Sequence, residues 1–192
     1  MNKLGIINLA LGKLGQSLLS EEDTSDDKYN FINSIYDHYK YLVEASHAWK
    51  FCMKRAAIAV DETAPAFGFT YRYALPDDFL RLIRLNDALA ENTDLYSIEG
   101  EYILTDMGTP LNIIYLAEND DESSYPSYFD EMLACRIAYE SCEHFKQEAN
   151  KKQTLMQEYG YNLKEARHCN MMQTSIMSLP LSATLKERLA GW

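Results

Sequence analysis

The sequence predicts an α+β protein, with a helical bundle of about four helices, an antiparallel β insertion of about five short strands between helices 2 and 3, and an extended C-terminal tail. Two observations predict this class. Apolar side chains recur with helical spacing towards both ends of the 192 residues. Between these stretches, residues 50–117 alternate apolar and polar side chains in short runs separated by turns. Runs this short with tight connections favour antiparallel hairpins over crossovers.

The N-terminal quarter predicts two helices. Residues 3–14 repeat apolar side chains at helical spacing, and Gly15 follows as a C-terminal stop. An acidic, hydroxyl-rich segment then offers Thr24 or Ser25 as an N-cap. Because no Gly or Pro interrupts the apolar stripe that follows, we expect the second helix to span residues 25–46.

The β insertion begins where the periodicity changes from helical to alternating. Trp49 and Phe51 occupy this change, and we expect both to anchor the second helix to the sheet. Further along, Pro76 sets a tight turn between two alternating runs. A turn around Gly100, between two short apolar runs, is typical of a hairpin.

The C-terminal part predicts two more helices and a change of character at the end. A helix over residues 128–147 has a wide apolar face and is expected at the centre of the core. Another helix is expected over residues 151–168. We therefore expect one domain of residues 1–169 and a separate tail of residues 170–192.

The tail is a candidate for docking on a partner. It has few acidic residues and several methionines, and Met adapts well to irregular apolar surfaces. The alternative is that it folds back on the core of its own chain. The candidate docking residues are Met171, Met172, Ile176, Met177, Leu179, Leu181, Leu185 and Trp192.

Charge and composition restrict the class of protein. The formal net charge is −11, which opposes a general nucleic-acid-binding role because affinity for phosphates comes mainly from Lys and Arg. No uncharged run approaches the roughly 20 residues needed to cross a bilayer, so we expect a soluble protein. The four cysteines do not form the dense framework of a small secreted domain, and reduced thiols in the cytoplasm are expected.

Possible catalytic or metal-binding groups are few and poorly spaced. Cys142 and His144 are zinc-type ligands, but residues two apart on a helix face different directions. Asp77 and Asp78 could form a carboxylate pair, although adjacent acids after a proline are also typical of a helix start. We favour the structural interpretation of each and expect no catalytic residue, metal or cofactor.

Tyrosine and arginine alternate in the β insertion. Such interleaving can stack nucleic-acid bases, but it also suits a half-buried sheet or a protein interface. The net charge favours the sheet or the interface. The candidate interface residues are Tyr71, Arg72, Tyr73, Pro76, Arg81 and Arg84.

The order of these features over residues 4–168 resembles the head-to-tail adaptor family of short-tailed phages, commonly called tail tubular protein A. The motifs that carry the resemblance are, in order, Ile7-Asn8-Leu9-Ala10-Leu11, Leu14-Gly15, His47-Ala48-Trp49-Lys50-Phe51, Lys54-Arg55-Ala56, Phe67-Gly68-Phe69, Tyr73-Ala74-Leu75-Pro76-Asp77-Asp78, Asn112-Ile113-Ile114-Tyr115, Pro126 and the helix over Ala134 to Ala138. No single motif is specific, and the resemblance depends on their order.

This resemblance implies a structural virion protein and no enzyme. Twelve copies would form a ring below the portal, extend the DNA channel for packaging retention and ejection, and carry the tail nozzle, spikes or fibres. The expected partners are the portal ring, these tail proteins and further copies of the chain, with genomic DNA passing through unbound. The protein would be found in the virion tail connector, and in the host cytoplasm during assembly. Two alternatives stay open: a small oligomeric scaffold or regulator of the helical class, and an acidic metal-dependent enzyme.

Overall fold

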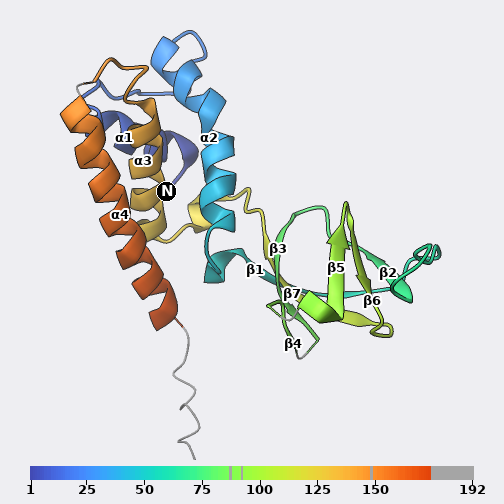
Figure 1. Cartoon of the computed structure of the whole chain (residues 1–192). Coiled ribbons are helices and arrows are strands. Elements are labelled where there is room, and N and C mark those ends of the chain that lie inside the picture. Colours follow the sequence, from blue (N-terminus) through green and yellow to red (C-terminus); the bar gives the residue numbers. More distant parts are fainter. Residues whose placement is uncertain (87, 92, 148, 174–192) are drawn as a thin grey trace, which may run out of the picture.

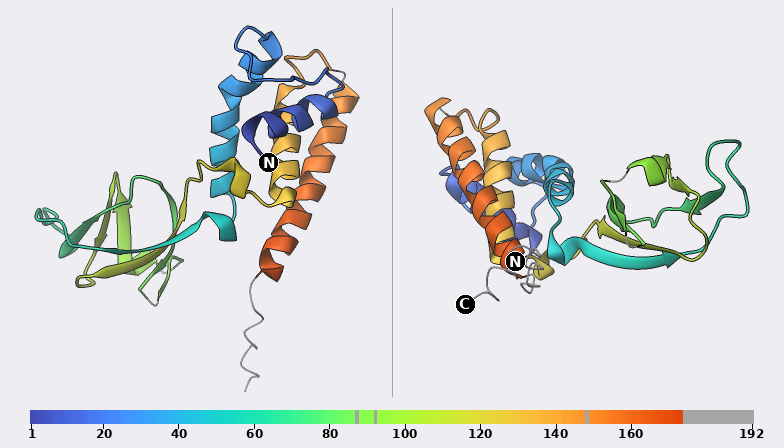
Figure 2. Two further views of the ribbon diagram at one scale, coloured as in Figure 1. Left: turned by 180° about the vertical axis from the view of Figure 1, so that it is seen from behind. Right: turned by 60° about the horizontal axis from the view of Figure 1, so that its bottom comes forward.

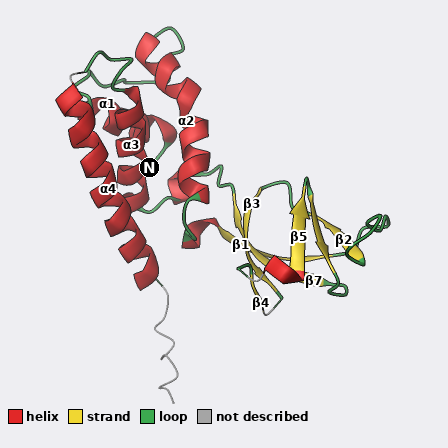
Figure 3. Cartoon of the chain, viewed as in Figure 1, coloured by secondary structure: helices red, strands yellow, loops and turns green. Residues whose placement is uncertain are grey.

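The computed structural model describes residues 1–86, 88–91, 93–147 and 149–173, and this part forms two lobes that lie side by side (Figure 1). The helical lobe contains α1 (Lys3–Lys13), α2 (Asp27–Ala45), α3 (Ser127–Ser141) and α4 (Ala149–Met172). The β lobe contains β1 (Met53–Ile58), β2 (Tyr71–Ala74), β3 (Phe79–Leu85), β4 (Ala88–Leu89), β5 (Tyr96–Glu99), β6 (Tyr102–Thr105) and β7 (Leu111–Ala117). Figure 3 shows this segregation of helices from strands, and the two views of Figure 2 show the lobes side by side.

The β lobe differs from the expected insertion. The protein is α+β in general, but the expectation of a four-helix bundle carrying about five strands is wrong, because the described residues form seven strands in two antiparallel sheets. One sheet has the order β1-β7-β3-β4 and the other has the order β2-β6-β5. Strand β4 has only two residues, too few for an alternating pattern, and follows a turn in which Asn86 has a φ of 49°. Periodicity also does not say which strands share a sheet.

The helix boundaries also shift from those expected. Helix α2 begins at Asp27 because the Asp26 carboxylate, and not a hydroxyl, accepts hydrogen bonds from the Lys28 and Tyr29 amides. Helix α3 ends at Ser141, six residues before the expected 147, and the following turn contains Lys146 at a φ of 51°. Helix α4 runs to Met172, so the expected boundary between domain and tail at 169/170 falls inside a helix.

Helix α3 is the centre of the helical lobe. It packs against α1, α2 and α4, and its apolar side chains are buried nearly all round. The fully buried members are Phe129, Met132, Leu133, Ala134, Cys135, Ile137 and Ala138. A helix that is apolar on most faces is stable in water only when other helices cover it, as they do here.

The β lobe has a second core between its two sheets. Alternate residues of β7, among them Leu111, Ile113 and Tyr115, point into this core, while Leu116 on the opposite face belongs to the core of the helical lobe. Strand β7 pairs with β1 on one side and β3 on the other. It therefore connects the two hydrophobic cores through its alternating faces.

The chain passes between the lobes twice, and both passages meet at one aromatic cluster. Trp49, on the way into β1, is fully buried and donates a hydrogen bond from Nε1 to the Val43 carbonyl at 2.8 Å. Its ring centroid lies 5.4 Å from that of Phe129, which lies on α3 after the chain has returned. Phe51 lies 4.7 Å from Phe129 and 5.4 Å from Tyr125. We call Trp49, Phe51, Tyr125 and Phe129 the junction cluster.

Replacing Trp49 with Ala should lower the free energy of unfolding by about 3–5 kcal/mol, because it removes the largest buried side chain of the junction cluster and leaves a void. Urea denaturation followed by circular dichroism measures the loss. The control is Phe67→Ala, a truncation of a side chain that is 89% exposed, which should change stability by less than about 0.5 kcal/mol. Equal stabilities of the two variants would refute the anchoring role of Trp49.

Candidate functional site

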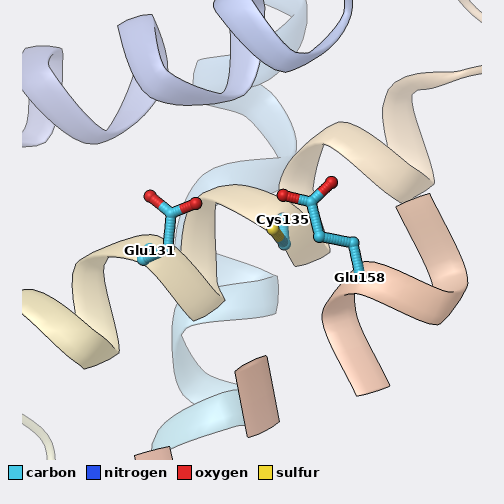
Figure 4. Close-up of side chains that lie close together, drawn as sticks. All are labelled: Glu131, Cys135 and Glu158. Atoms are coloured by element: carbon cyan, nitrogen blue, oxygen red, sulfur yellow. The ribbon is translucent and has the colours of Figure 1, made fainter. Parts of the chain in front are cut away.

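One group of potential metal ligands occurs among the described residues. Glu131 and Cys135, one turn apart on α3, and Glu158 on α4 bring their ligand atoms within 4.8 Å of one another (Figure 4). The Nζ atom of Lys13 on α1 lies 2.5 Å from Glu131 Oε1 and 2.6 Å from Glu158 Oε1. A lysine ammonium therefore already supplies the positive charge that a metal would bring. This arrangement is a salt bridge that joins α1, α3 and α4.

The protonation of this cluster supports a structural role. Burial opposes the charge on Lys13, but hydrogen bonds with Glu131 and Glu158 outweigh it and raise the pKa of the ammonium above its usual value. Burial also raises the pKa of the Cys135 thiol to about 11. A thiol with that pKa stays protonated at neutral pH and is a poor nucleophile and a poor metal ligand.

A second polar cluster holds the chain on its return from the β lobe. Glu44 on α2 is fully buried and accepts a hydrogen bond from the Tyr125 hydroxyl at 2.6 Å. Lys40, one turn earlier, is buried and pairs with Glu118 at 3.4 Å and with Asp120 at 3.2 Å. Burial raises the pKa of the Glu44 carboxyl to about 7, against the lowering effects of Tyr125 and Lys40. These groups fasten the β7–α3 connection to α2.

The two pairs of possible ligands in the sequence, Cys142 with His144 and Asp77 with Asp78, both lie in structural positions. Cys142 is buried and its Sγ atom lies 3.4 Å from the Ala138 carbonyl, whereas His144 is exposed and stacks on Phe31 at 3.5 Å between ring centroids. Strand β3 begins at Phe79, which confirms the strand expected after the turn at Pro76, so the interpretation of Asp77 and Asp78 as a helix start is wrong.

The Asp78 carboxylate instead ties three strands of one sheet together at the start of β3. It pairs with Lys54 of β1 at 2.6 Å and accepts a hydrogen bond from the Tyr115 hydroxyl of β7 at 3.0 Å.

Three of the six candidate interface residues are buried in the β lobe or interact with other residues of it. Tyr73 is fully buried between the sheets and donates a hydrogen bond to the Met107 carbonyl at 2.8 Å, so it has no surface to offer a partner. Arg72 pairs with Asp61 at 2.8 Å and lies 4.2 Å from the centroid of the Tyr102 ring. Tyr71 is half-buried beside Tyr73, at 6.5 Å between ring centroids.

The other three candidates reach the surface. Pro76 is half-buried at the edge of an open pocket between the turn before β3 and the β5–β6 hairpin. Arg81 and Arg84 are exposed on β3 and form no ion pair with any described residue. These two arginines are therefore available to a partner.

The tail candidates lie only partly within the described chain. Met171 and Met172 form the last turn of α4 and are mostly exposed. The remaining six, Ile176, Met177, Leu179, Leu181, Leu185 and Trp192, lie outside the described residues.

Sequence reasoning missed two features. Asn170, assigned to the tail, is buried at the junction of the lobes, where its Oδ1 accepts from the Lys50 amide at 2.8 Å and its Nδ2 donates to the Ala48 carbonyl at 3.0 Å. Phe67, noticed only as part of a motif, is 89% exposed in the loop between β1 and β2. The sequence signal for this apolar loop was the presence of Pro65 and Phe69 beside Phe67 in a segment between two strands.

No family model and no curated protein sequence matches the chain. Within the described ranges, none of the helices is long and apolar enough to cross a bilayer.

Replacing Lys13 with Met should lower the free energy of unfolding by about 1–2 kcal/mol, because the Glu131 and Glu158 carboxylates would then face each other without a cation. Their side chains are about two-fifths exposed, and water reduces the penalty. The control is Lys152→Met, which removes the more exposed ion pair with Glu143 and should lower stability much less. Thermal denaturation of both variants measures the difference, and equal costs would contradict the structural role of Lys13.

Replacing Glu44 with Gln should change how stability depends on pH. The pKa of Glu44 is raised on folding, so its contribution is fully present below its ordinary pKa of 4.5 and is lost as pH rises through about 7. Between pH 5 and 8 the wild type should lose on the order of 2 kcal/mol relative to the variant. Urea denaturation at several pH values measures this loss. Glu21→Gln, at an exposed position, should follow the wild-type profile, and a wild-type profile for Glu44→Gln as well would contradict the assignment.

Proposed function

We propose that this chain is a structural virion protein, a head-to-tail adaptor that forms a ring between the portal and the tail of a short-tailed phage. The observation that carries the proposal is the arrangement of two lobes with separate cores, joined through the junction cluster. Such a chain can hold one partner on each lobe while keeping a fixed distance between them. The order of motifs along the sequence supports the same class.

In this proposal each lobe has its own partner. The helical lobe and the tail that follows α4 contact the portal, and the exposed Met171 and Met172 begin the apolar segment that docks. The β lobe faces the nozzle, spikes or fibres of the tail, and its exposed Arg81 and Arg84 contact either these proteins or neighbouring copies of the chain. Twelve copies form the ring, DNA passes through its lumen without specific binding, and the protein is assembled in the host cytoplasm into the virion.

The enzyme alternative has less support. Its best cluster among the described residues, Glu131, Cys135 and Glu158, is neutralised by Lys13. One zinc or manganese per chain after purification, held through Cys142, His144 or Asp77, would nevertheless favour it. A small scaffold or regulator would sediment as a fixed small oligomer without any portal, whereas an adaptor should gain its ring through multivalent attachment to the portal.

Electron microscopy of the protein mixed with the portal protein of the same phage genome should show a ring stacked on the portal. A chain ending after Gln173 should keep its helical content and lose this binding, because it lacks the docking tail. The cut is placed there because ending after Cys169 would remove Asn170 from the junction of the lobes. Undiminished binding by the shortened chain would refute the tail as the portal contact, and full-length protein that never binds a portal would refute the adaptor function.

A further inference from the structure

The loop between β1 and β2 presents an apolar tip to solvent. We call residues 61–70 the Phe67 loop. It projects from the end of the β lobe that is farthest from the helices (Figures 1 and 2). Phe67 is 89% exposed, and its neighbours Ala66 and Gly68 are exposed as well. A phenyl ring held in water in this way makes few contacts within its own chain, and its burial against another surface is favourable.

Hydrogen bonds at both ends of the Phe67 loop fix its base. At one end the Asp61 carboxylate accepts from the Thr63 amide at 2.8 Å and pairs with Arg72 at 2.8 Å. At the other end the Asp106 carboxylate accepts from the amide of Thr70 at 2.8 Å and from its hydroxyl at 2.7 Å. A loop held in this way loses less conformational entropy when its tip binds, which is typical of a preformed contact surface.

A pocket of about 460 Å³ lies at the other end of the β lobe, next to the helical lobe. We call it the β3–β4 pocket. Its walls are mainly apolar and include Ala48, Leu82, Ile83, Leu89 and Tyr96. Leu89 is about half exposed at its edge, so the pocket opens to solvent. A phenylalanine side chain is small enough to enter a pocket of this volume.

We propose that the Phe67 loop of one copy of this chain docks in the β3–β4 pocket of a second copy. The Phe67 loop projects from the end of the β lobe farthest from the helices, whereas the pocket is lined by Ala48 and by residues of β3 and β4 close to the helical lobe, so the two surfaces do not meet within a single chain. The contact is therefore intermolecular. Because the loop and the pocket are different surfaces, each copy offers one free loop and one free pocket, and the contact can repeat head to tail, as the ring of the proposed function requires.

Charge complementarity favours a second copy as the occupant. On the loop side, Glu99 is exposed and lines the same surface hollow as Phe67, and Glu62 is exposed within the Phe67 loop itself. On the pocket side, Arg81 and Glu91 are in the lining, and Arg84, which is paired with the lining residue Leu89 across β3 and β4, is exposed as well. Opposite charges at the two surfaces steer the encounter and suppress loop-to-loop pairing.

The electrostatics behind the pocket agree with this polarity. His47, next to the pocket residue Ala48, has its pKa lowered first by burial and then by the charges of Arg167, Arg81 and Lys50. Three basic side chains therefore lie close enough to His47 to act on it, in a chain whose net charge is −11. An acidic loop from a second copy finds a favourable potential there.

Cross-linking of two separately labelled copies tests the contact. One copy carries Ala66→Cys, which leaves Phe67 in place, and the other carries Glu91→Cys at the pocket rim. Both also carry Cys169→Ser, since the remaining cysteines are buried. The two copies are mixed and oxidised by copper phenanthroline with dissolved oxygen. The yield of mixed disulfide should be about tenfold higher than for a control pair, because docking raises the effective concentration of the two thiols. The control replaces the pocket cysteine with Glu21→Cys, an exposed site on the helical lobe.

Removal of the aromatic side chain completes the test. Adding Phe67→Ser to the Ala66→Cys chain should reduce the mixed disulfide to the control level, and the chain should still fold because this side chain is exposed. A yield equal to that of the Glu21→Cys control, a yield unaffected by Phe67→Ser, or disulfides between two loops alone would each overturn the proposal.

This inference rests on the proposed function only in that the contact joins neighbouring copies of the adaptor ring. The contact and the adaptor function can each be refuted without the other. A ring on the portal without the cross-link refutes this contact and leaves the adaptor function standing. A cross-link from chains that never bind a portal refutes the adaptor function and leaves the contact standing.

Discussion

The structure depends on one constraint: the chain must leave the helical lobe and return to it at the same place. The junction cluster satisfies this constraint because it packs side chains of the two connecting segments against one another. Phe51 belongs to the outgoing segment, while Tyr125 and Phe129 belong to the returning segment, and their rings lie 4.7 to 5.4 Å apart. Aromatic pairs at such distances prefer tilted or edge-to-face arrangements, as found here. Polar bonds from Glu44 and Asn170 secure the same region, so the orientation of the β lobe is determined by both packing and hydrogen bonding.

Strand β7 carries this constraint into the β lobe. Because side chains of a strand alternate between its faces, one strand can belong to two cores. Leu116 is buried with the helices, and its neighbours Tyr115 and Ala117 are buried between the sheets. Neither core can be disturbed at this strand without affecting the other. The two lobes therefore have separate hydrophobic cores, but a change at β7 affects the stability of both.

The sequence revealed the helices and the junction better than the arrangement of the strands. Apolar spacing marks α1 and α2 because each has one covered face, and the change of period at Trp49 marks the junction. The end of α3 was missed because Lys146 takes a positive φ without being glycine. Tyr73 was taken for a surface residue because alternation does not tell which face another sheet will cover. The salt bridge of Lys13 joins helices far apart in the chain, and no local pattern encodes it.

The pairing of Met53 with Leu116 has an evolutionary consequence. Paired residues of antiparallel strands have Cα atoms about 5 Å apart, so the 64 residues from 53 to 116 begin and end at almost the same point. A segment with adjacent ends can lengthen, shorten or be replaced without pulling on the domain that hosts it. The loops of the β lobe that lie away from the shared strand β7 are therefore the part of the chain in which changes of length disturb the helical lobe least.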